Sequence, residues 1–334
     1  MYTLLKSLAV LLLGFMVILE NAGAQERGNR ARSKPKPAKV SLHIDQGPLA
    51  FAARQAAEVK AGSIVLMNGV ASRMVGPFDF GKDDWEEITG ALAKAANCEV
   101  AEGKHYHFVY PTGDPAYETL SGFTFGGSVD SRLASKETTF RFGADIPLYN
   151  ALALLGHTLG VTLVADNAVA DTLSGEVILD DAPLGDVLDA LCKSARIARE
   201  TVAAEGDATY VFIRSIENVS KQDLLTNENE LDAAARERLE AKVDVSLPAP
   251  PKDNARFEAA EGPVTLASVL ATLSAQLGVP VTADRGLEKL PVNPVVMRDI
   301  PARTAINLLI RQWPVAKFAW SWIDGGVRLV YLGA

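Results

Sequence analysis

Residues 147–161 read PLYNALALLGHTLGV, and residues 265–279 read TLASVLATLSAQLGV. The two stretches align without a gap, and leucines recur in both at the same positions, four, three and four residues apart. This spacing lies along one side of an α-helix, so each stretch is predicted to form an amphipathic helix. Gly160 or Gly278 follows the last leucine and can take the left-handed conformation that ends a helix. An internal repeat is the strongest signal in this chain.

The repeat has a third, weaker copy nearer the N-terminus. Adding 99 to each number in the stretch 48–62 aligns it with 147–161. Further along, one column holds Leu92, Leu191 and Leu309, and another holds Lys94, Lys193 and Arg311. The basic column falls in the last turn of a predicted helix, where positive charge stabilises the helix dipole by about 0.3 kcal/mol. We therefore interpret this column as structural.

Each copy predicts the same order of elements. The expected strands of the second copy are 139–142, 162–165, 176–179, 201–203 and 209–213, and the last two strands of the third copy are 318–322 and 327–331. A second helix follows the third strand, with its apolar stripe at Leu184, Val187, Leu188 and Leu191. Asp181 with Pro183, and Asp299 with Pro301, are expected to begin this helix, with the aspartate as its cap.

These elements predict an α+β fold of three small βαββαββ modules, each a mixed sheet with two helices packed on one face. The expected boundaries are 40–113 for module 1, 138–216 for module 2 and 255–334 for module 3. Residues 114–137 are expected to form a connector, either a loop or a loosely docked hairpin around Phe123 and Phe125. Modules of about 75 residues have small cores, so neighbouring modules are expected to dock.

The second connector, residues 217–254, is predicted to be helical and then proline-rich. Asn227 and Glu230 form a capping pattern, and Leu231, Ala235 and Leu239 make a narrow apolar stripe. We expect a helix over residues 228–242. Pro248, Pro250 and Pro251 then predict an extended spacer.

The N-terminal segment has the features of an export signal. Lys6 precedes the apolar run 8–19, and small residues follow at 22–24, so residues 1–24 are predicted to be a cleaved signal peptide. An uncleaved anchor is the alternative, although a spanning helix needs about 20 apolar residues. Residues 25–39 are rich in Arg, Lys, Pro and Gly and predict a disordered basic linker. No cysteine follows the small residues, so no lipid anchor is indicated.

Composition argues against one class of partner. The chain of 334 residues has 33 basic and 41 acidic residues, a net charge of -8. Negative charge opposes binding to phosphate backbones, so no nucleic-acid partner is expected.

The repeated unit resembles the short N-terminal domain shared by secretins and TonB-dependent receptors. The resemblance rests on a helix ending Leu-Gly-Val, a strand ending Ala-Asp, and a second helix opening Asp-Ala-Pro-Leu at 181–184 or Asp-Ile-Pro-Ala at 299–302. It covers most of 138–216 and 255–334, and 40–113 less closely. It implies a periplasmic protein-interaction module, which in secretins packs side by side into rings. No long alternating strands follow the third copy, so neither a secretin channel nor a receptor barrel is expected.

The search for reactive residues predicts no catalytic, cofactor-binding or metal-binding site. His105 and His107 are expected on one face of a strand, where they could share a metal ion, but the polar face of a half-exposed strand is the favoured interpretation. His157 lies outside the leucine stripe and is expected at the surface, and His43 is isolated. Cys98 is expected to be a small buried hydrophobe, and Cys192 lies beside a helix stripe. A disulfide between the two cysteines is left open.

Two further groups have structural explanations that outweigh functional ones. Acidic residues surround one helix start, and helix capping by Asp83 with Glu86 is favoured over calcium binding or acid–base chemistry. This group comprises Asp79, Asp83, Asp84, Glu86 and Glu87. Phe318, Trp320 and Trp322 alternate along a strand, and core packing is favoured over a ligand-stacking platform.

Together these features predict an exported, non-enzymatic interaction scaffold or adaptor of the bacterial cell envelope, without cofactors. The expected partners are other envelope proteins, such as secretin-like or inner-membrane components. The alternative is a periplasmic ligand-binding or cell-wall-active protein that uses clefts between modules. Self-assembly into a ring or filament is a third alternative.

Overall fold

The computed structural model describes residues 41–114, 136–197, 200–203, 210–214, 224–247, 264–313 and 318–332. Within these ranges the protein has an α+β fold, as the sequence predicts. We call residues 41–114 the first segment, 136–214 the second segment and 224–332 the third segment. The predicted signal peptide, the basic linker and the residues around Phe123 and Phe125 lie outside the described residues. None of the described helices is long and apolar enough to cross a membrane.

The first segment is built from short strands around two helices. Its elements are β1 (Leu42–Ile44), β2 (Gly47–Pro48), α1 (Leu49–Lys60), β3 (Ile64–Leu66), β4 (Met74–Val75), β5 (Phe78–Phe80), α2 (Trp85–Ala95), β6 (Cys98–Glu102) and β7 (His107–Pro111). A capping box starts α2, because Asp84 accepts a bond from the Glu87 N–H while Glu87 accepts one from the Asp84 N–H. The cap is therefore Asp84 with Glu87, one residue beyond the predicted pair. Asp83 instead accepts a bond from the Gly81 N–H.

The second segment follows the predicted order of elements closely. It comprises β8 (Glu137–Phe142), α5 (Leu148–Leu159), β9 (Thr162–Ala165), α6 (Asn167–Ala170), β10 (Val177–Pro183), α7 (Leu184–Ser194), β11 (Glu200–Ala203) and β12 (Tyr210–Arg214). Helix α5 ends at Gly160, whose φ of 61° confirms the predicted left-handed cap.

The third segment has two additional short helices before its first strand. Its elements are η1 (Glu228–Glu230), α8 (Ala233–Glu240), β13 (Lys242–Leu247), α9 (Leu266–Leu277), β14 (Val281–Ala283), η2 (Leu287–Lys289), β15 (Val295–Pro301), α10 (Ala302–Ile310), β16 (Phe318–Ile323) and β17 (Gly326–Tyr331). The expected helix 228–242 is wrong in its bounds. Asp232 accepts a bond from the Ala235 N–H at 2.7 Å and so starts α8 at Ala233, and Lys242 already belongs to a strand.

The predicted role of Asp181 and Asp299 as helix caps is also wrong. Strands β10 and β15 continue to Pro183 and Pro301, and neither helix has a capping bond from a side chain. Asp181 and Asp299 instead occupy bulges in these strands, with φ of 49° and 47°. Aspartate tolerates this left-handed conformation better than most residues, which explains its presence at both bulges.

The sheets join neighbouring segments. One five-stranded sheet has the order β6-β7-β3-β10-β8, so its first three strands come from the first segment and its last two from the second. A second sheet, β11-β12-β9-β15-β13, joins the second and third segments in the same way. The third segment ends in the three-stranded sheet β14-β17-β16. This differs from the expectation of a separate sheet in each module with helices on one face.

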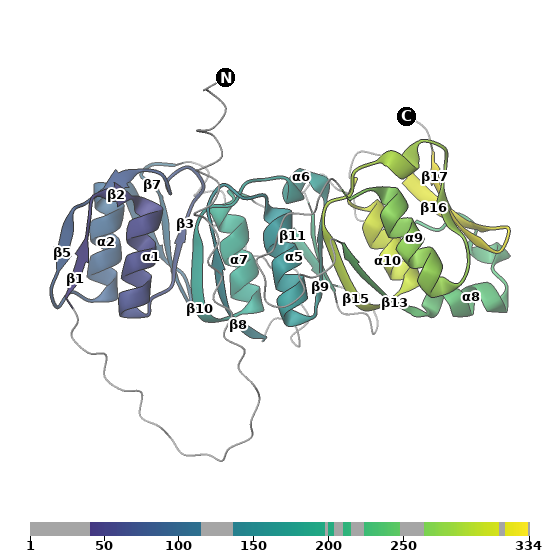
Figure 1. Ribbon diagram of the computed structural model, residues 1–334, viewed down its shortest axis with the longest axis horizontal. Coiled ribbons are helices and arrows are strands. Elements are labelled where there is room, and N and C mark those ends of the chain that lie inside the picture. Colours follow the sequence, from purple (N-terminus) through teal and green to yellow (C-terminus); the bar gives the residue numbers. More distant parts are fainter. Residues whose placement is uncertain are drawn as a thin grey trace, which may run out of the picture.

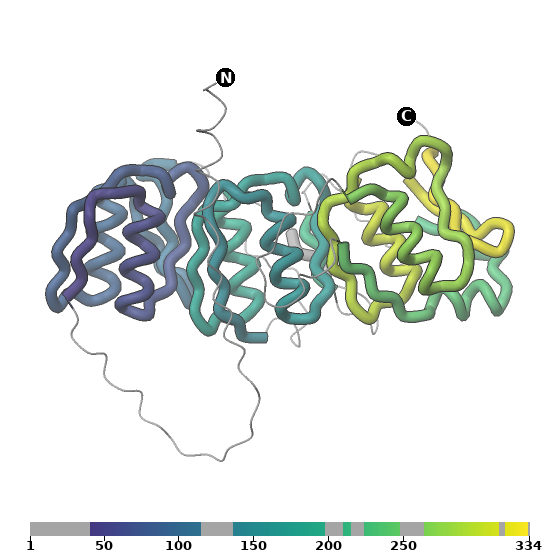
Figure 2. The backbone as a smooth tube through the Cα atoms, viewed as in Figure 1, coloured from purple at the N-terminus to yellow at the C-terminus, as the bar shows by residue number. Residues whose placement is uncertain are grey.

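The result is a row of alternating layers of helices and sheets (Figures 1 and 2). In the first shared sheet, Ile64 and Ile178 belong to the core around α1 and α2, whereas Val65 and Val177 belong to the core around α5 and α7. Each shared sheet therefore has helices on both faces. Because successive side chains of a strand point to opposite faces, one strand contributes to two adjacent cores.

Candidate interaction surfaces

The two junctions between segments use the same hydrogen bonds. At the first junction, the Asp180 N–H donates to Ser63 Oγ at 3.1 Å. At the second, the Arg298 N–H donates to Thr162 Oγ1 at 2.7 Å. A hydroxyl at the start of one strand thus anchors the strand of the next segment in both places.

A second bond is also repeated. The Asn68 N–H donates to the Ser194 C=O at 2.6 Å, and the Asn167 N–H donates to the Gln312 C=O at 2.7 Å. The Ser194 carbonyl lies in the last residue of α7, and the Gln312 carbonyl lies two residues beyond the end of α10, where no further turn of helix supplies a donor. Docking thereby satisfies groups that would otherwise need water.

Apolar side chains cross each junction into the next core. Val65 and Phe108 pack into the core of the second segment, and Val164 and Phe212 pack into that of the third. All four are at most 3% exposed. Burying an aromatic and a branched side chain is worth roughly 3–6 kcal/mol per junction before the cost of ordering is subtracted.

A glycine allows close contact at both junctions, with backbone at the first and with a side chain at the second. A Cβ at Gly175 would lie 1.8 Å from the Leu66 carbonyl oxygen, and a Cβ at Gly156 would lie 2.9 Å from Cβ of Val296. The strands and helices can approach this closely only because these positions lack side chains.

The first junction also contains charged and polar contacts. Glu176, whose side chain is 3% exposed, accepts bonds from Arg54 Nε at 2.6 Å and Nη2 at 2.7 Å. These bonds raise the pKa of the Arg54 guanidinium. The Tyr106 hydroxyl donates to Asp189 across the junction, and burial, followed by the charge of Asp189, raises the Tyr106 pKa far above its usual value.

The three residues of the basic column, Lys94, Lys193 and Arg311, have different surroundings. Lys193 forms an ion pair with Asp189 at 2.9 Å and lies 5.8 Å from the centre of the Tyr106 ring, so it contributes to the first junction. Lys94 lies in the last turn of α2, as predicted, and Arg311 caps α10 in a buried position.

The two ends of the row have different residues at the junction positions. On β5, Asp79 occupies the place of Ile178 and Val296; it is exposed and bonded to His43 at 2.6 Å. On the last sheet, Thr282 occupies the place of Val65 and Val164, and Arg328 that of Phe108 and Phe212. Both are exposed, and Arg328 is paired with Asp284 at 2.8 Å.

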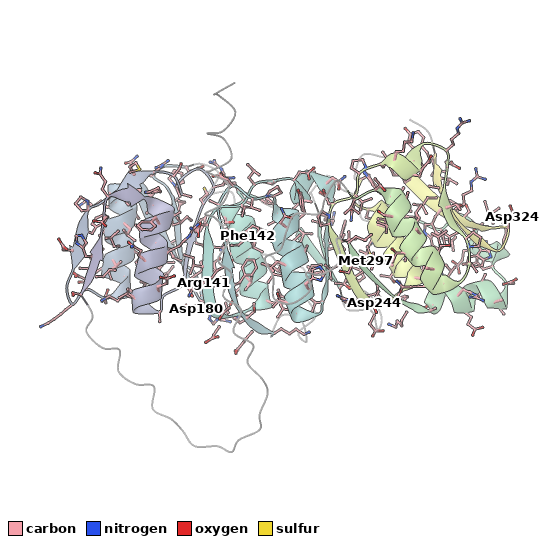
Figure 3. All side chains as sticks on the ribbon, viewed as in Figure 1. Arg141, Phe142, Asp180, Asp244, Met297 and Asp324 are labelled. Atoms are coloured by element: carbon pink, nitrogen blue, oxygen red, sulfur yellow. The ribbon has the colours of Figure 1, made fainter. Side chains whose placement is uncertain are left out.

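A shallow groove runs between β8 and α5 in the second segment. Thr138, Thr139 and Arg141 of β8 line one side, and Leu154, Leu155 and Thr158 of α5 line the other. Arg141 is paired with Asp180 at 3.2 Å beside it, and Figure 3 shows both side chains at the same end of the shared sheet. No carboxylate lines this groove.

The structure separates the two histidines considered as metal ligands. Strand β7 begins at His107, which bonds to Thr89 Oγ1 at 2.7 Å within the first segment. His105 lies before the strand and contacts Asp186 of the second segment at 3.1 Å. The expectation that both lie on one strand is therefore wrong. Among the described residues, no group of three or more His, Cys, Asp or Glu side chains could hold a metal ion.

His157 was expected at the surface but lies half-buried at the second junction. Its Nε2 is 3.4 Å from Ser246 Oγ of β13. Burial, assisted by the positive charge of Arg298, lowers its pKa. Comparison with the other copies missed this contact because the histidine packs against a different segment. His43, by contrast, is exposed, and its bonds to Asp79 and Asp45 raise its pKa.

The lowered pKa of His157 predicts a pH-dependent second junction. The folded protein binds this proton less readily than the unfolded chain, so stability is complete above the ordinary pKa of 6.5 and falls as pH drops through the lower folded value. We expect wild type to lose more stability between about pH 8 and about pH 5 than His157→Gln, as measured by urea unfolding. Equal losses in the two proteins would contradict the assignment. The pKa of His43 is raised, so its effect on stability has the opposite sign. His43 is present in both proteins, and its effect therefore cancels in the comparison.

The other reactive or aromatic candidates have structural roles. Cys98 and Cys192 are buried in different cores and form no disulfide with each other, which answers the question that the sequence leaves open. Trp320 is fully buried, and its Nε1–H donates to Asn307 at 2.9 Å. Phe318 and Trp322 pack beside it, which confirms core packing for this aromatic strand.

The described residues thus define an α+β protein whose segments dock by sharing sheets. Comparison with protein-family models, curated proteins and solved structures found no match.

Proposed function

We propose that this protein is an exported, non-enzymatic interaction scaffold or adaptor of the bacterial cell envelope, built from modules similar to the secretin N-terminal domain. The observation that carries the proposal is the sharing of sheets between segments. Because docking joins the three segments in a row, strand edges along its length are held in fixed relative positions. Such edges bind partner segments by strand addition.

Several described strands lie at sheet edges. Strands β6 and β8 lie at the two edges of the first shared sheet, and β11 and β13 lie at the edges of the second. The edge of β16 is already covered, since the Trp320 N–H donates to the Leu224 C=O and the Thr226 N–H to the Trp320 C=O. The proposal therefore places partners along the sides of the row.

Site-specific photocrosslinking in a Gram-negative host tests this proposal. A photoreactive residue placed at Thr139 on the β8 edge is expected to capture an envelope protein from the periplasmic fraction, whereas the same residue at Asp324 in the β16–β17 turn serves as control. Crosslinking at both sites or neither, or retention of the chain in the cytoplasm, would contradict the proposal. Binding of purified peptidoglycan fragments would favour the alternative of a cell-wall-active protein.

Self-assembly through the ends is opposed by the residues found there. In a head-to-tail contact, β5 of one copy would pair with β14 of another, which would take Asp79 and Arg328 out of water together with their partners His43 and Asp284. Removing charges from water costs roughly several kcal/mol per ion, and the attraction within a buried pair often fails to offset this cost. We expect sedimentation velocity to show a monomer at every concentration.

Replacing these residues provides the converse test. The triple variant Asp79→Ile, Thr282→Val, Arg328→Phe restores the side-chain classes of the internal junctions. We expect this variant to associate as its concentration rises. Association of the wild-type chain, or a triple variant that stays monomeric while folded, would contradict the role assigned to the end residues.

A further inference from the structure

Matching bulges identify equivalent edge positions in two segments. The ladder between β8 and β10 passes from Thr138 opposite Ala182 to Phe140 opposite Leu179, which leaves out Thr139. The ladder between β13 and β15 passes from Val243 opposite Ile300 to Val245 opposite Met297, which leaves out Asp244. In both cases the side chain left out accepts a bond from the bulged aspartate, at 3.4 Å for Thr139 and 3.0 Å for Asp244.

In the third segment, a side-chain amide occupies this edge. The Asp244 N–H donates to Gln276 Oε1 at 2.8 Å, and Gln276 Nε2 donates to the Asp244 C=O. One carboxamide thus satisfies both main-chain groups of Asp244, as the N–H and C=O of one residue in an added antiparallel strand would. Helix α9, which carries Gln276, packs along β13. Figure 3 labels Asp244 at the lower end of the second shared sheet, as it labels Arg141 and Asp180 at the lower end of the first.

In the second segment, none of the described residues places an amide at the same position, and the Thr139 C=O accepts a bond from the Thr138 hydroxyl at 3.3 Å. Thr158 lies two residues before the glycine that ends α5, as Gln276 does before the glycine that ends α9. Thr158 is exposed and has no amide, and the groove described above lies between it and Thr139. The groove is open on one side, and its cavity volume is about 10 Å³, far below the roughly 300–1,000 Å³ of small-molecule pockets. It therefore does not enclose a small-molecule ligand, whereas a strand that adds to the β8 edge needs no enclosed cavity.

We propose that the groove between β8 and α5 binds an extended peptide segment of a partner protein. The segment adds to β8, the edge strand of the described sheet, and places the N–H and C=O of one of its residues, or the side-chain amide of Asn or Gln, on Thr139 as Gln276 does on Asp244. Leu154, half-buried on α5, contacts an apolar residue of the segment. This inference rests on the proposed scaffold function and specifies its partner surface.

The test uses the full mature chain and a synthetic library of random acetylated heptapeptides, with binding followed by fluorescence anisotropy. We expect library members to bind wild type, with Thr139 amide exchange slowed on binding. Thr158→Gln supplies the missing amide in place and is expected to weaken the best peptide about tenfold, equivalent to about 1.4 kcal/mol. Thr158→Ser is the control and is expected to bind as wild type does. Methylation of the peptide backbone nitrogens should also abolish binding.

A variant of the third segment is expected to gain a second peptide site. Gln276→Ala is expected to open the β13 edge and raise the stoichiometry from one peptide to two. The proposal is overturned if no library member binds wild type, or if Thr158→Gln binds equally well. It is also overturned if Thr139 is already protected in the free chain and no peptide binds, since the groove would then be filled by the chain itself. Capture of an envelope partner that Thr158→Gln leaves unchanged would overturn this site and leave the scaffold function intact.

Discussion

Replacement of Gly175 by alanine is expected to break the junction between the first and second segments and to lower stability by about 3 kcal/mol or more. The added Cβ would lie 1.8 Å from the Leu66 carbonyl oxygen and 2.8 Å from the Asn68 nitrogen. Both are backbone atoms and have no rotamer to change. The Leu66 N–H donates to the Glu176 C=O at 2.8 Å beside this contact, so any shift separates β3 from β10.

Hydrogen exchange and urea unfolding measure this effect. We expect amides of β3 and β10 to exchange faster in Gly175→Ala, while those of β14 and β17 keep their protection. The matched control is Gly90→Ala on α2, where the added Cβ meets nothing within 4 Å. Alanine there should stabilise by about 0.5–1 kcal/mol, because helical glycine has a large conformational entropy in the unfolded chain. Wild-type stability and exchange in Gly175→Ala would show that the two strands do not approach as described.

Removal of Arg54 is expected to have the second largest effect, about 2–4 kcal/mol for Arg54→Met. The variant leaves the Glu176 carboxylate, 3% exposed, with the Ala144 N–H at 3.2 Å but without its two guanidinium bonds. An uncompensated buried charge is strongly destabilising. Because Arg54 itself is 44% exposed, water enters part of the site and the lower half of this range is expected.

A double-mutant cycle separates the charge from the packing. Adding Glu176→Gln to Arg54→Met should recover much of the loss, since a neutral amide costs less to bury than a carboxylate. Arg328→Met is the control, because its partner Asp284 lies in an exposed pair that is worth about 0–1 kcal/mol. If Arg54→Met cost no more than this control, the ion pair would have no role at the junction.

Local signals predicted the elements well. The leucine spacing of 148–159 corresponds to helix α5, and the strand expected at 162–165 has the same bounds as β9. Glycine at 160 ends the helix because only a local backbone conformation is needed there. The errors at the caps of α2 and α8 were shifts within a local pattern, whereas the error at Asp181 occurred where a distant contact competed with a local pattern. Asp181 has the spacing of a cap but sits in a bulge, whose geometry depends on the opposite strand.

The sequence contains only one weak signal of the shared sheets. Strand β3 is apolar at three successive positions, Ile64, Val65 and Leu66, and β9 is similar. Such runs indicate burial on both faces, which a separate sheet with helices on one side does not require. A strand between two helical layers does require it. This signal would have predicted shared sheets.

The amino-acid sequence alone determined the helices α5 and α9 with the glycines that end them, the order of strands along the second copy and the α+β class, because these depend on residues within a few positions of each other. Only the tertiary structure decided which strands pair across segments, that Glu176 is buried against Arg54, and that Gln276 bonds the main chain of Asp244 at the edge of β13. Strand pairing joins residues far apart in the chain, so its register depends on side chains meeting in space and has no local code.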